Sequence, residues 1–352
     1  MNYQDSKPLA IDVFCGCGGL TTGLKHAGFK VIGAIDIDRI ATATYKANHP
    51  EVRVWIKDIK VIAARSIIRN LNIRKGELDL LAGCPPCQGF STLRTLNGSL
   101  TIDDQRNDLL LEFLKFVEAL MPKSVMIENV PGLAEDERFK IFCRTLKKLG
   151  YKGSHRILDA ADYGVPQRRD RLIYLAGNGF AIPFAKRSTN RKTVYDAIGE
   201  MSLAGNSGDF LHDMPERHTR RIHNLIENIP KNGGSRADLP KKYQLKCHKK
   251  CDGFKDVYGR MAWDKPAPTI TTGCFNPSKG RFLHPDQNRA ITMRESAVLQ
   301  GFPKRYKFTG TKSKTMIALM IGNALPPPFI RRHARSIKRT LVKNKFCLGA
   351  GS

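Results

Sequence analysis

Four apolar, strand-like runs constrain the fold of this chain more than any other feature of its sequence. They cover residues 9–14, 31–35, 78–82 and 124–127, and helical stretches such as 108–120 lie between them. Alternation of strand and helix predicts an α/β fold with a doubly wound, mostly parallel sheet. Each run ends in glycine, cysteine or acidic residues, and ligands bind such sheets at the carboxyl ends of the strands. We therefore expect a ligand site at that edge.

The cluster after the first run is rich in glycine. Gly16, Gly18 and Gly19 let a ligand approach the backbone between a strand and a helix. A dehydrogenase fingerprint would have a further glycine where Thr21 stands, so the pattern fits a nucleoside cofactor more generally. Asp36, after the second run, can accept hydrogen bonds from ribose hydroxyls. A tight packing turn without a ligand is the alternative, and this cluster alone does not decide between them.

The cluster after the third run holds two cysteines. Pro85 and Pro86 restrict the backbone before Cys87 and hold its sulfur in one direction. A metal site at Cys84 and Cys87 would need two further ligands, and the chain has no second Cys-x-x-Cys. A redox pair is typical of a different, smaller class of protein. A buried, inert cysteine is the usual alternative, and a strand end in a Gly/Pro loop argues against it.

Charged residues follow the fourth run and precede a later one. Glu128 places a carboxylate at the end of an apolar run, where burial would raise its pKa and suit it to donate a proton or hold a ring nitrogen. Gln167, Arg169 and Arg171 alternate before the apolar run 172–175. On a strand they would share a face, and two guanidiniums would converge on one site. A surface charge run is the alternative.

The charge balance indicates a polyanionic partner. Lys and Arg number 59 against 32 acidic residues, a net charge of +27, although a halo of solvated lysines is the alternative. Apolar periodicity weakens from about 180 to about 258, which indicates a smaller, basic module. We expect a catalytic domain at 1–180, this module at 181–280 and a return to the catalytic domain at 281–346. Residues 331–345 hold seven basic side chains and no acidic one, so phosphate contact and a solvated helix face both stay open there.

Other features narrow the class of protein. No apolar run approaches the roughly 20 residues of a membrane-spanning helix, and residues 1–10 lack a signal peptide. Nine cysteines in 352 residues do not resemble a disulfide framework, so we expect an intracellular, reduced protein. Cys247, His248 and Cys251 suggest zinc, but only Cys274 offers a distant fourth ligand, and structural sites want four. We therefore expect no metal.

Taken in order, these motifs resemble those of the DNA (cytosine-5) methyltransferase family. The match runs from about residue 9 to residue 330. It skips only the basic middle, which in that family is the variable target-recognition region. The motifs that carry the resemblance are Phe14-x-Gly16-x-Gly18, Pro86-Cys87-Gln88, Glu128-Asn129-Val130, Gln167-x-Arg169-x-Arg171, Arg294-Glu295, Gln300-Gly301-Phe302-Pro303 and Gly322-Asn323.

The resemblance implies S-adenosylmethionine as cofactor and a role for each motif. Cys87 would be the nucleophile, Glu128 would contact the ring nitrogen and exocyclic amine of cytosine, and Arg169 and Arg171 would steady the flipped nucleotide and the active-site loop. The cofactor contacts would be Phe14, Gly16, Cys17, Gly18, Gly19, Asp36, Ile37, Asp58, Ile59, Pro86, Asn323 and Ala324. The substrate contacts would be Gln88, Ser91, Arg94, Arg106 and Gln167. Ala324-Leu325 departs from the hydroxyl residue and valine often found there, so we expect only a backbone role at that point.

The implied reaction begins with addition of the thiolate to carbon 6, aided by Glu128. The ring becomes an enamine, whose carbon 5 attacks the methyl group of the sulfonium donor and breaks its bond to sulfur. Because the base is inaccessible in a stacked duplex, it must be flipped out at a cost of about a few kcal/mol. The loss of the carbon 5 proton and elimination of Cys87 would release the product.

The implied partners are double-stranded DNA and, acting separately, a cognate restriction endonuclease. The chain would work as a monomer on DNA in a prokaryotic cytoplasm at the nucleoid, or in the nucleus if eukaryotic. One alternative is a tRNA cytosine methyltransferase of the same fold, although the long basic module favours a duplex reader. The other is a catalytically dead homologue that binds nucleic acid. The presence of every catalytic residue argues against it. The recognition sequence depends on loop geometry and is not encoded in these patterns.

Overall fold

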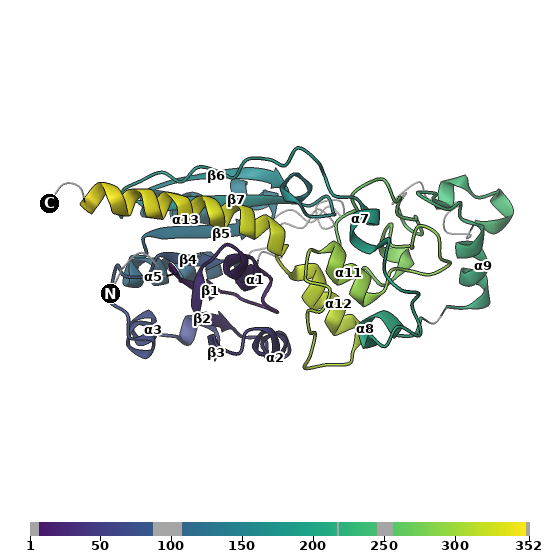
Figure 1. Cartoon of the computed structure of the whole chain (residues 1–352), viewed down its shortest axis with the longest axis horizontal. Helices are drawn as coiled ribbons and strands as arrows, with labels where there is room; N and C mark the ends of the chain where they lie inside the picture. Colours follow the sequence, from purple (N-terminus) through teal and green to yellow (C-terminus); the bar gives the residue numbers. More distant parts are fainter. Residues whose placement is uncertain (1–6, 87–107, 217, 245–255, 350–352) are drawn as a thin grey trace. The chain divides into compact units, whose positions relative to one another are not determined.

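The structure, a computed structural model, describes residues 7–86, 108–216, 218–244 and 256–349. Contacts between residues divide the chain into two compact units. Unit 1 contains residues 1–159, 170–187 and 325–352, and unit 2 contains residues 160–169 and 188–324. Figure 1 shows the elements of both.

Unit 1 is built on a seven-stranded sheet in the order β3-β2-β1-β4-β5-β7-β6. The first five strands are parallel, whereas β7 runs antiparallel to both β5 and β6. This confirms the doubly wound, mostly parallel prediction. The strand order reverses between β1 and β4, the kind of point at which such sheets bind ligands. The strands are β1 Leu9–Val13, β2 Lys30–Asp36, β3 Arg53–Ile56, β4 Leu80–Gly83, β5 Ser124–Asn129, β6 Tyr151–Asp159 and β7 Asp170–Asn178.

Helices cover both faces of this sheet. Alternate residues of a strand point to opposite faces; Ile11 and Val13 therefore join the apolar core under α3, α5 and α6, while Asp12 faces Thr21 of α1 on the other side. Helix α13 packs along α1 and inserts Ile330, Ala334, Ile337 and Leu341. The bounds are α1 Gly19–His26, α2 Arg39–Asn48, η1 Ile59–Val61, α3 Ala64–Leu71, α5 Leu109–Leu120, η3 Pro131–Glu135, α6 Glu137–Lys148 and α13 Pro327–Gly349.

Unit 2 is less regular, and a buried arginine helps to hold it together. The Arg260 side chain is fully buried and donates hydrogen bonds to the backbone oxygens of Ile226 (2.8 Å), Ile229 (3.0 Å) and His284 (2.9 Å). At the same place Ile222, Leu225, Ile226 and Ile229 recur at helical spacing and belong to an apolar cluster. The helices are η4 Ala160–Tyr163, α7 Val194–Ile198, α8 Phe210–Asp213, α9 Arg220–Asn228, η5 Arg236–Asp238, η6 Lys241–Tyr243, η7 Pro277–Lys279, α11 Met293–Leu299 and α12 Lys314–Asn323.

In the part of the chain that the structure describes, no helix combines the length and the apolar character needed to cross a membrane.

Candidate active site

A buried carboxylate lies at the end of β5, between a thiol and a guanidinium. Glu128 is 2% exposed, and the parallel pairing of β4 with β5 brings it beside the residue after Gly83. The Cys84 thiol donates a hydrogen bond to Glu128 Oε2 at 3.0 Å. On the other side, Arg171 Nε lies 3.1 Å from Glu128 Oε1. Three strands of unit 1 therefore fix the two oxygens of one carboxylate.

The next residue, Asn129, ties the end of β5 to the peptide that leads to the expected nucleophile. Its amide nitrogen donates to the carbonyl of Pro85 at 2.9 Å, and its amide oxygen accepts from the nitrogen of Val130 at 2.8 Å. The side chain is 4% exposed. No role for Asn129 was predicted from the sequence, although it stands in the Glu128-Asn129-Val130 motif.

Several expected site residues lie outside the described part of the chain. Cys87 is among them, and Pro86, the residue before it, is described and exposed. The remainder of this set comprises Gln88, Ser91, Arg94 and Arg106, the expected DNA contacts of the following loop.

The loop after β1 crosses the end of β2. Phe14 adopts a left-handed conformation (φ 65°), which is uncommon for a bulky side chain. The nitrogens of Phe14 and Cys15 both donate to Ile35 O, at 2.8 and 3.0 Å, and Gly16 N donates to Asp36 Oδ2 at 2.7 Å. Burial raises the pKa of Asp36. The end of β2 thus holds the glycine loop through its backbone and one carboxylate.

The space around this loop fits a nucleoside cofactor. A Cβ at Gly16 would have no atom within 4 Å, so the cradle above the loop is open. Ile37 is 65% exposed although apolar, which leaves a surface for an adenine beside Asp36. A Cβ at Gly19 would lie 2.4 Å from Leu325 O, so glycine is needed where α1 meets the start of the last segment.

The other residues of unit 1 that we expect to contact the cofactor also shape the local backbone or are buried. Asp58 begins η1, and its Oδ1 accepts from Lys60 N at 2.9 Å. Ile59 and Cys17 are buried, and burial raises the pKa of the Cys17 thiol to about 12. Gly18 has φ 98° at the start of α1, a conformation that favours glycine.

A buried carboxyl under the glycine loop escaped the sequence analysis. Asp12 is fully buried, and the Thr21 hydroxyl donates to its Oδ2 at 2.7 Å. The Tyr45 hydroxyl lies 2.8 Å from the same threonine oxygen. Burial raises the pKa of Asp12 to about 8. The hydroxyl at Thr21, in place of the dehydrogenase glycine, was the signal that could have revealed it.

The expected single strand through Gln167, Arg169 and Arg171 does not form. Strand β7 begins at Asp170, because Gln167 instead bridges to Ala267. Arg171 therefore belongs to unit 1, whereas Gln167 and Arg169 belong to unit 2.

In unit 2, the two residues bind backbone of the same unit. Gln167 is fully buried and accepts a hydrogen bond from Ile270 N at 2.9 Å. Arg169 donates to Ile270 O at 3.1 Å and to Gly322 O at 2.8 Å. Asn323, the next residue, is exposed, and Ala324 is half-buried. Arg169 thus holds the Gly-Asn element in place through its backbone.

The Arg294-Glu295 motif also has a structural role. Glu295 closes a capping box with Thr292 at the start of α11 and forms an ion pair with Arg289 at 2.7 Å. The guanidinium of Arg294 contacts Asp209.

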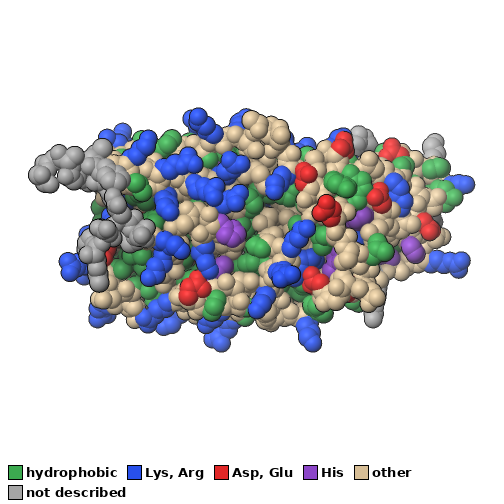
Figure 2. Space-filling model, viewed as in Figure 1, with side chains coloured by type: hydrophobic (Ala, Val, Ile, Leu, Met, Phe, Trp, Pro, Cys, Tyr) green, Lys and Arg blue, Asp and Glu red, His purple; other side chains and the backbone are tan. Residues whose placement is uncertain are grey.

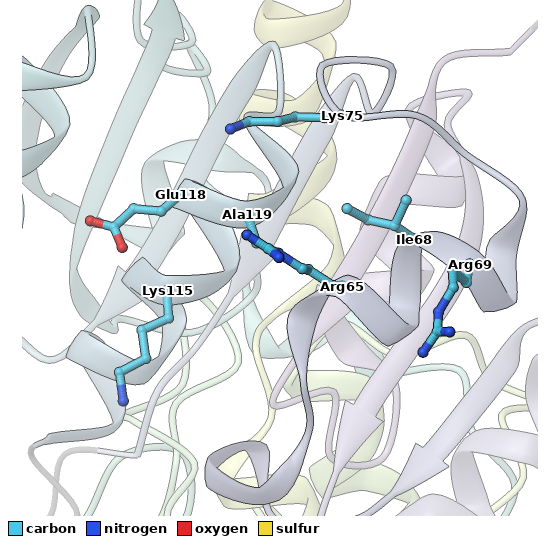
Figure 3. A pocket seen from close by; sticks show the side chains of 7 residues that line it. All are labelled: Arg65, Ile68, Arg69, Lys75, Lys115, Glu118 and Ala119. Carbon is cyan, nitrogen blue, oxygen red and sulfur yellow. The ribbon is translucent and has the colours of Figure 1, made fainter.

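A groove of about 720 Å³ lies between α3 and α5. Its apolar floor contains Ile68 and Ala119, and basic side chains surround it (Figure 3). None of the motif residues lines it, so it is not the catalytic site. The other lining residues are Arg65, Arg69, Lys75, Lys115 and Glu118.

Among the described residues, no group of three or more His, Cys, Asp or Glu side chains could hold a metal ion. Cys274 is buried there, which raises the pKa of its thiol to about 11. Cys247, His248 and Cys251 lie outside the described ranges.

The sequence of this chain matches the model of a known protein family. The model of the C-5 cytosine-specific DNA methylases matches residues 9–339. The chain belongs to this family. It is a DNA (cytosine-5) methyltransferase, and the methyltransferase family implies S-adenosylmethionine as methyl donor and DNA as substrate.

Relatives of this methyltransferase match along most of its length. The Type II methylase M.HgiDII of Herpetosiphon aurantiacus is 38% identical, over 94% of this chain and 95% of the relative. The Type II methyltransferase M1.HphI of Haemophilus parahaemolyticus is 33% identical, over 93% and 86%. Among solved structures, the Entamoeba histolytica methyltransferase EhMeth matches with a TM-score of 0.65 and 19% identity, over 96% of this chain and 99% of that one. This structural likeness confirms the fold.

Proposed function

We propose that the chain methylates carbon 5 of a flipped-out cytosine in duplex DNA through a covalent adduct with Cys87. We further propose sequence-specific action of the Type II restriction-modification kind, which the names of the two relatives support. The observation that carries the proposal is the buried Glu128 carboxylate, fixed between Cys84 and Arg171, beside the peptide that leads to Cys87.

The two oxygens of Glu128 have different partners, which suggests which one meets the base. Oε1 faces a guanidinium, a strong and permanently charged partner. Oε2 accepts from the Cys84 thiol, and a thiol is a weak donor. A ring nitrogen that carries a proton, or an exocyclic amine, can therefore replace the thiol at Oε2 while Arg171 keeps the carboxylate oriented. A hydrogen bond to the ring nitrogen favours addition of the Cys87 sulfur at carbon 6.

The residues around the glycine loop would hold the cofactor. When bound, S-adenosylmethionine supplies an electrophilic methyl group. Asp36 would accept hydrogen bonds from the ribose, Ile37 would cover one face of the adenine, and Gly16 would leave room for close approach of the nucleoside. In the same proposal Phe14, Cys17, Gly18, Gly19, Asp58, Ile59, Pro86, Asn323 and Ala324 complete the cofactor contacts.

The partners and setting follow from a DNA substrate. Gln88, Ser91, Arg94 and Arg106 would contact the nucleic acid, and Arg169 and Arg171 would steady the flipped nucleotide. Gln167, predicted as a further contact, is fully buried and bonded to Leu299 and Ile270, so it would act through unit 2 instead. The chain would act as a monomer on DNA, with a cognate endonuclease as a separate protein. The bacterial Type II relatives support a prokaryotic cytoplasm as its place of action.

The test is methyl transfer from labelled cofactor to genomic DNA and, in parallel, to tRNA, followed by nucleoside analysis. We expect labelled 5-methyldeoxycytidine, confined to one sequence context when the modified cytosines are located by sequencing. Label in tRNA alone would support the RNA alternative, and no label in either would support the catalytically dead homologue. Both outcomes contradict the proposal.

A further inference from the structure

A row of basic side chains runs along the outer face of α13. At 100° per residue, Arg332, Arg335, Arg339 and Lys343 lie on one stripe of the helix. Arg335, Arg339 and Lys343 are exposed, and Arg332 is half-buried. Arg332 and Lys343 are 11 positions apart, which is roughly 16 Å at 1.5 Å per residue. On the face shown in Figure 2, Lys and Arg side chains gather over the part of unit 1 where Figure 1 draws α13, with few acidic side chains among them.

Within the described ranges, no acidic side chain pairs with the charges of this stripe. Arg332, Arg335, Arg339 and Lys343 form no ion pair with another described residue. Like charges at i,i+4, such as Arg335 and Arg339, destabilise an isolated helix by about 0.2–0.5 kcal/mol per pair. A helix face adapted only to water would alternate the two signs. The repeated repulsion indicates a polyanion that relieves it.

Two further basic residues, Arg331 and His26, lie near the stripe. Arg331 Nε is buried and has no hydrogen-bond partner in the described residues. Burial and the nearby Arg335 and Arg332 lower the pKa of Arg331. Burial and then Arg331 lower the pKa of His26, at the end of α1. The start of α13 therefore lies close to the end of α1.

The stripe starts beside the cofactor loop and leads away from it. Leu325 touches Gly19 at the start of α1, and Ile330 touches Gly23 one turn later. Arg332 follows directly, and Lys338 reaches Gly28 O near the other end of α1. B-DNA carries one negative charge per 1.7 Å of its axis, approximately, so a stripe of this length can face several phosphates.

We propose that the Arg332–Arg335–Arg339–Lys343 stripe of α13 is a second DNA contact, which binds phosphates of duplex outside the target site. The proposal goes beyond methyl transfer and rests on the proposed function only in taking duplex DNA as the polyanion. The contact is independent of base sequence, because it involves the backbone alone. Its role is to hold the enzyme on DNA between target sites. The duplex is either the flank of the target duplex or a second segment.

Two matched triple variants test this. Arg335→Gln/Arg339→Gln/Lys343→Gln removes three charges from the stripe, and Arg65→Gln/Arg69→Gln/Lys75→Gln removes three from the rim of the α3–α5 groove. Binding to a long duplex of arbitrary sequence is measured over a range of salt concentrations. Each lost phosphate contact lowers the slope of log affinity against log salt by about 0.9. We expect the slope to fall by roughly 2 to 3 in the α13 variant and by less than about 1 in the groove variant.

The kinetic readout separates positioning on DNA from catalysis. We expect the α13 variant to keep the wild-type kcat at saturating DNA and to raise KM for long DNA several-fold. If the affinity for DNA rises with duplex length, the stripe binds the flank of the target duplex. If the wild type binds two short duplexes and the α13 variant binds one, the stripe binds a second DNA segment. Equal slope changes in both variants, or none in the α13 variant, would overturn the inference. Should the chain bind DNA in this way but transfer no methyl group to it, only the proposed function fails.

Discussion

The Cys84 thiol, directly after β4, donates a 3.0 Å hydrogen bond to the Glu128 carboxylate of the neighbouring parallel strand β5. The pairing of β4 with β5 aligns Gly83 with Ile127, so each strand presents its next residue at the same edge. Arg171, from the antiparallel β7, completes the arrangement. The sheet register alone therefore determines which groups surround the carboxylate.

Glu128→Gln keeps the shape of the side chain but removes its charge and its ion pair with Arg171. General acid–base assistance contributes about 10²–10⁴-fold to a rate. We expect kcat to fall by at least about 10²-fold, while the Kd for DNA stays within a few-fold of wild type. Single-turnover methylation measures the first and fluorescence anisotropy the second. Glu118→Gln, on the exposed side of α5, is the control and should leave both unchanged; a Glu128→Gln variant as active as this control would refute the assigned role.

Arg171→Lys preserves the charge and loses the planar guanidinium. Because a lysine presents a point charge with different geometry, the Glu128 carboxylate should lose its fixed orientation. We expect kcat to drop about tenfold with cofactor affinity unchanged, which corresponds to about 1.4 kcal/mol of transition-state stabilisation. Arg156→Lys, on the exposed edge strand β6, provides the comparison. Equal activity of the two variants would show that orientation by Arg171 is not needed.

Asn129→Ala removes the donor that holds the Pro85 carbonyl. The lost hydrogen bond costs about 1 kcal/mol, with a further penalty for the unsatisfied carbonyl. We expect a modest fall in the free energy of unfolding, by chemical denaturation, and a larger fall in kcat, since the peptide before Cys87 is released. Asn129→Ser, whose hydroxyl can donate, should recover part of kcat. A variant with reduced stability and unchanged kcat would limit Asn129 to a structural role.

Gly16→Ala and Gly76→Ala form a matched pair for the cofactor cradle. Both glycines have positive φ, and an added Cβ at either would meet no atom within 4 Å. Each substitution should cost about 1–2 kcal/mol of stability from backbone strain. Only Gly16→Ala should also weaken binding of S-adenosylmethionine, by calorimetry, because its methyl group enters the proposed cradle. Equal affinities of the two variants would place the cofactor elsewhere.

Asp12 should make stability depend on pH. Its folded-state pKa of about 8 lies above the ordinary value of 3.8, so the folded protein keeps a proton that the unfolded chain releases. Stability from this group is therefore complete below pH about 4 and is lost as the pH rises to about 8. Asp12→Asn lacks this titration. We expect the free energy of unfolding of the variant, relative to wild type, to rise steadily from pH 5 to pH 8; a constant difference would contradict the buried, protonated carboxyl.

The sheet and its ligand-bearing edge could be predicted because they depend on local patterns. Apolar runs specify buried strands, and the residues that interrupt them mark the strand ends. The hydrogen bond from Asn129 to Pro85 could not be predicted, since its partner comes from another element. Likewise, the start of β7 is set by the pairing of Gln167 with Ala267, about a hundred residues away, and not by local alternation. In unit 2, the hydrogen bonds from Arg260 to distant backbone oxygens leave little signal in the sequence, since any residue can supply a backbone oxygen.

The most direct test of the mechanism is to trap the enzyme on DNA in which every cytosine is 5-fluorocytosine. Fluorine replaces the hydrogen that must leave carbon 5 as a proton. Elimination therefore stops, and the sulfur stays bonded to carbon 6. We predict an adduct on denaturing gels that depends on S-adenosylmethionine, persists in Cys84→Ser, disappears in Cys87→Ser and maps by mass spectrometry to Cys87. An adduct on Cys84, or one that survives in Cys87→Ser, would contradict the proposed nucleophile.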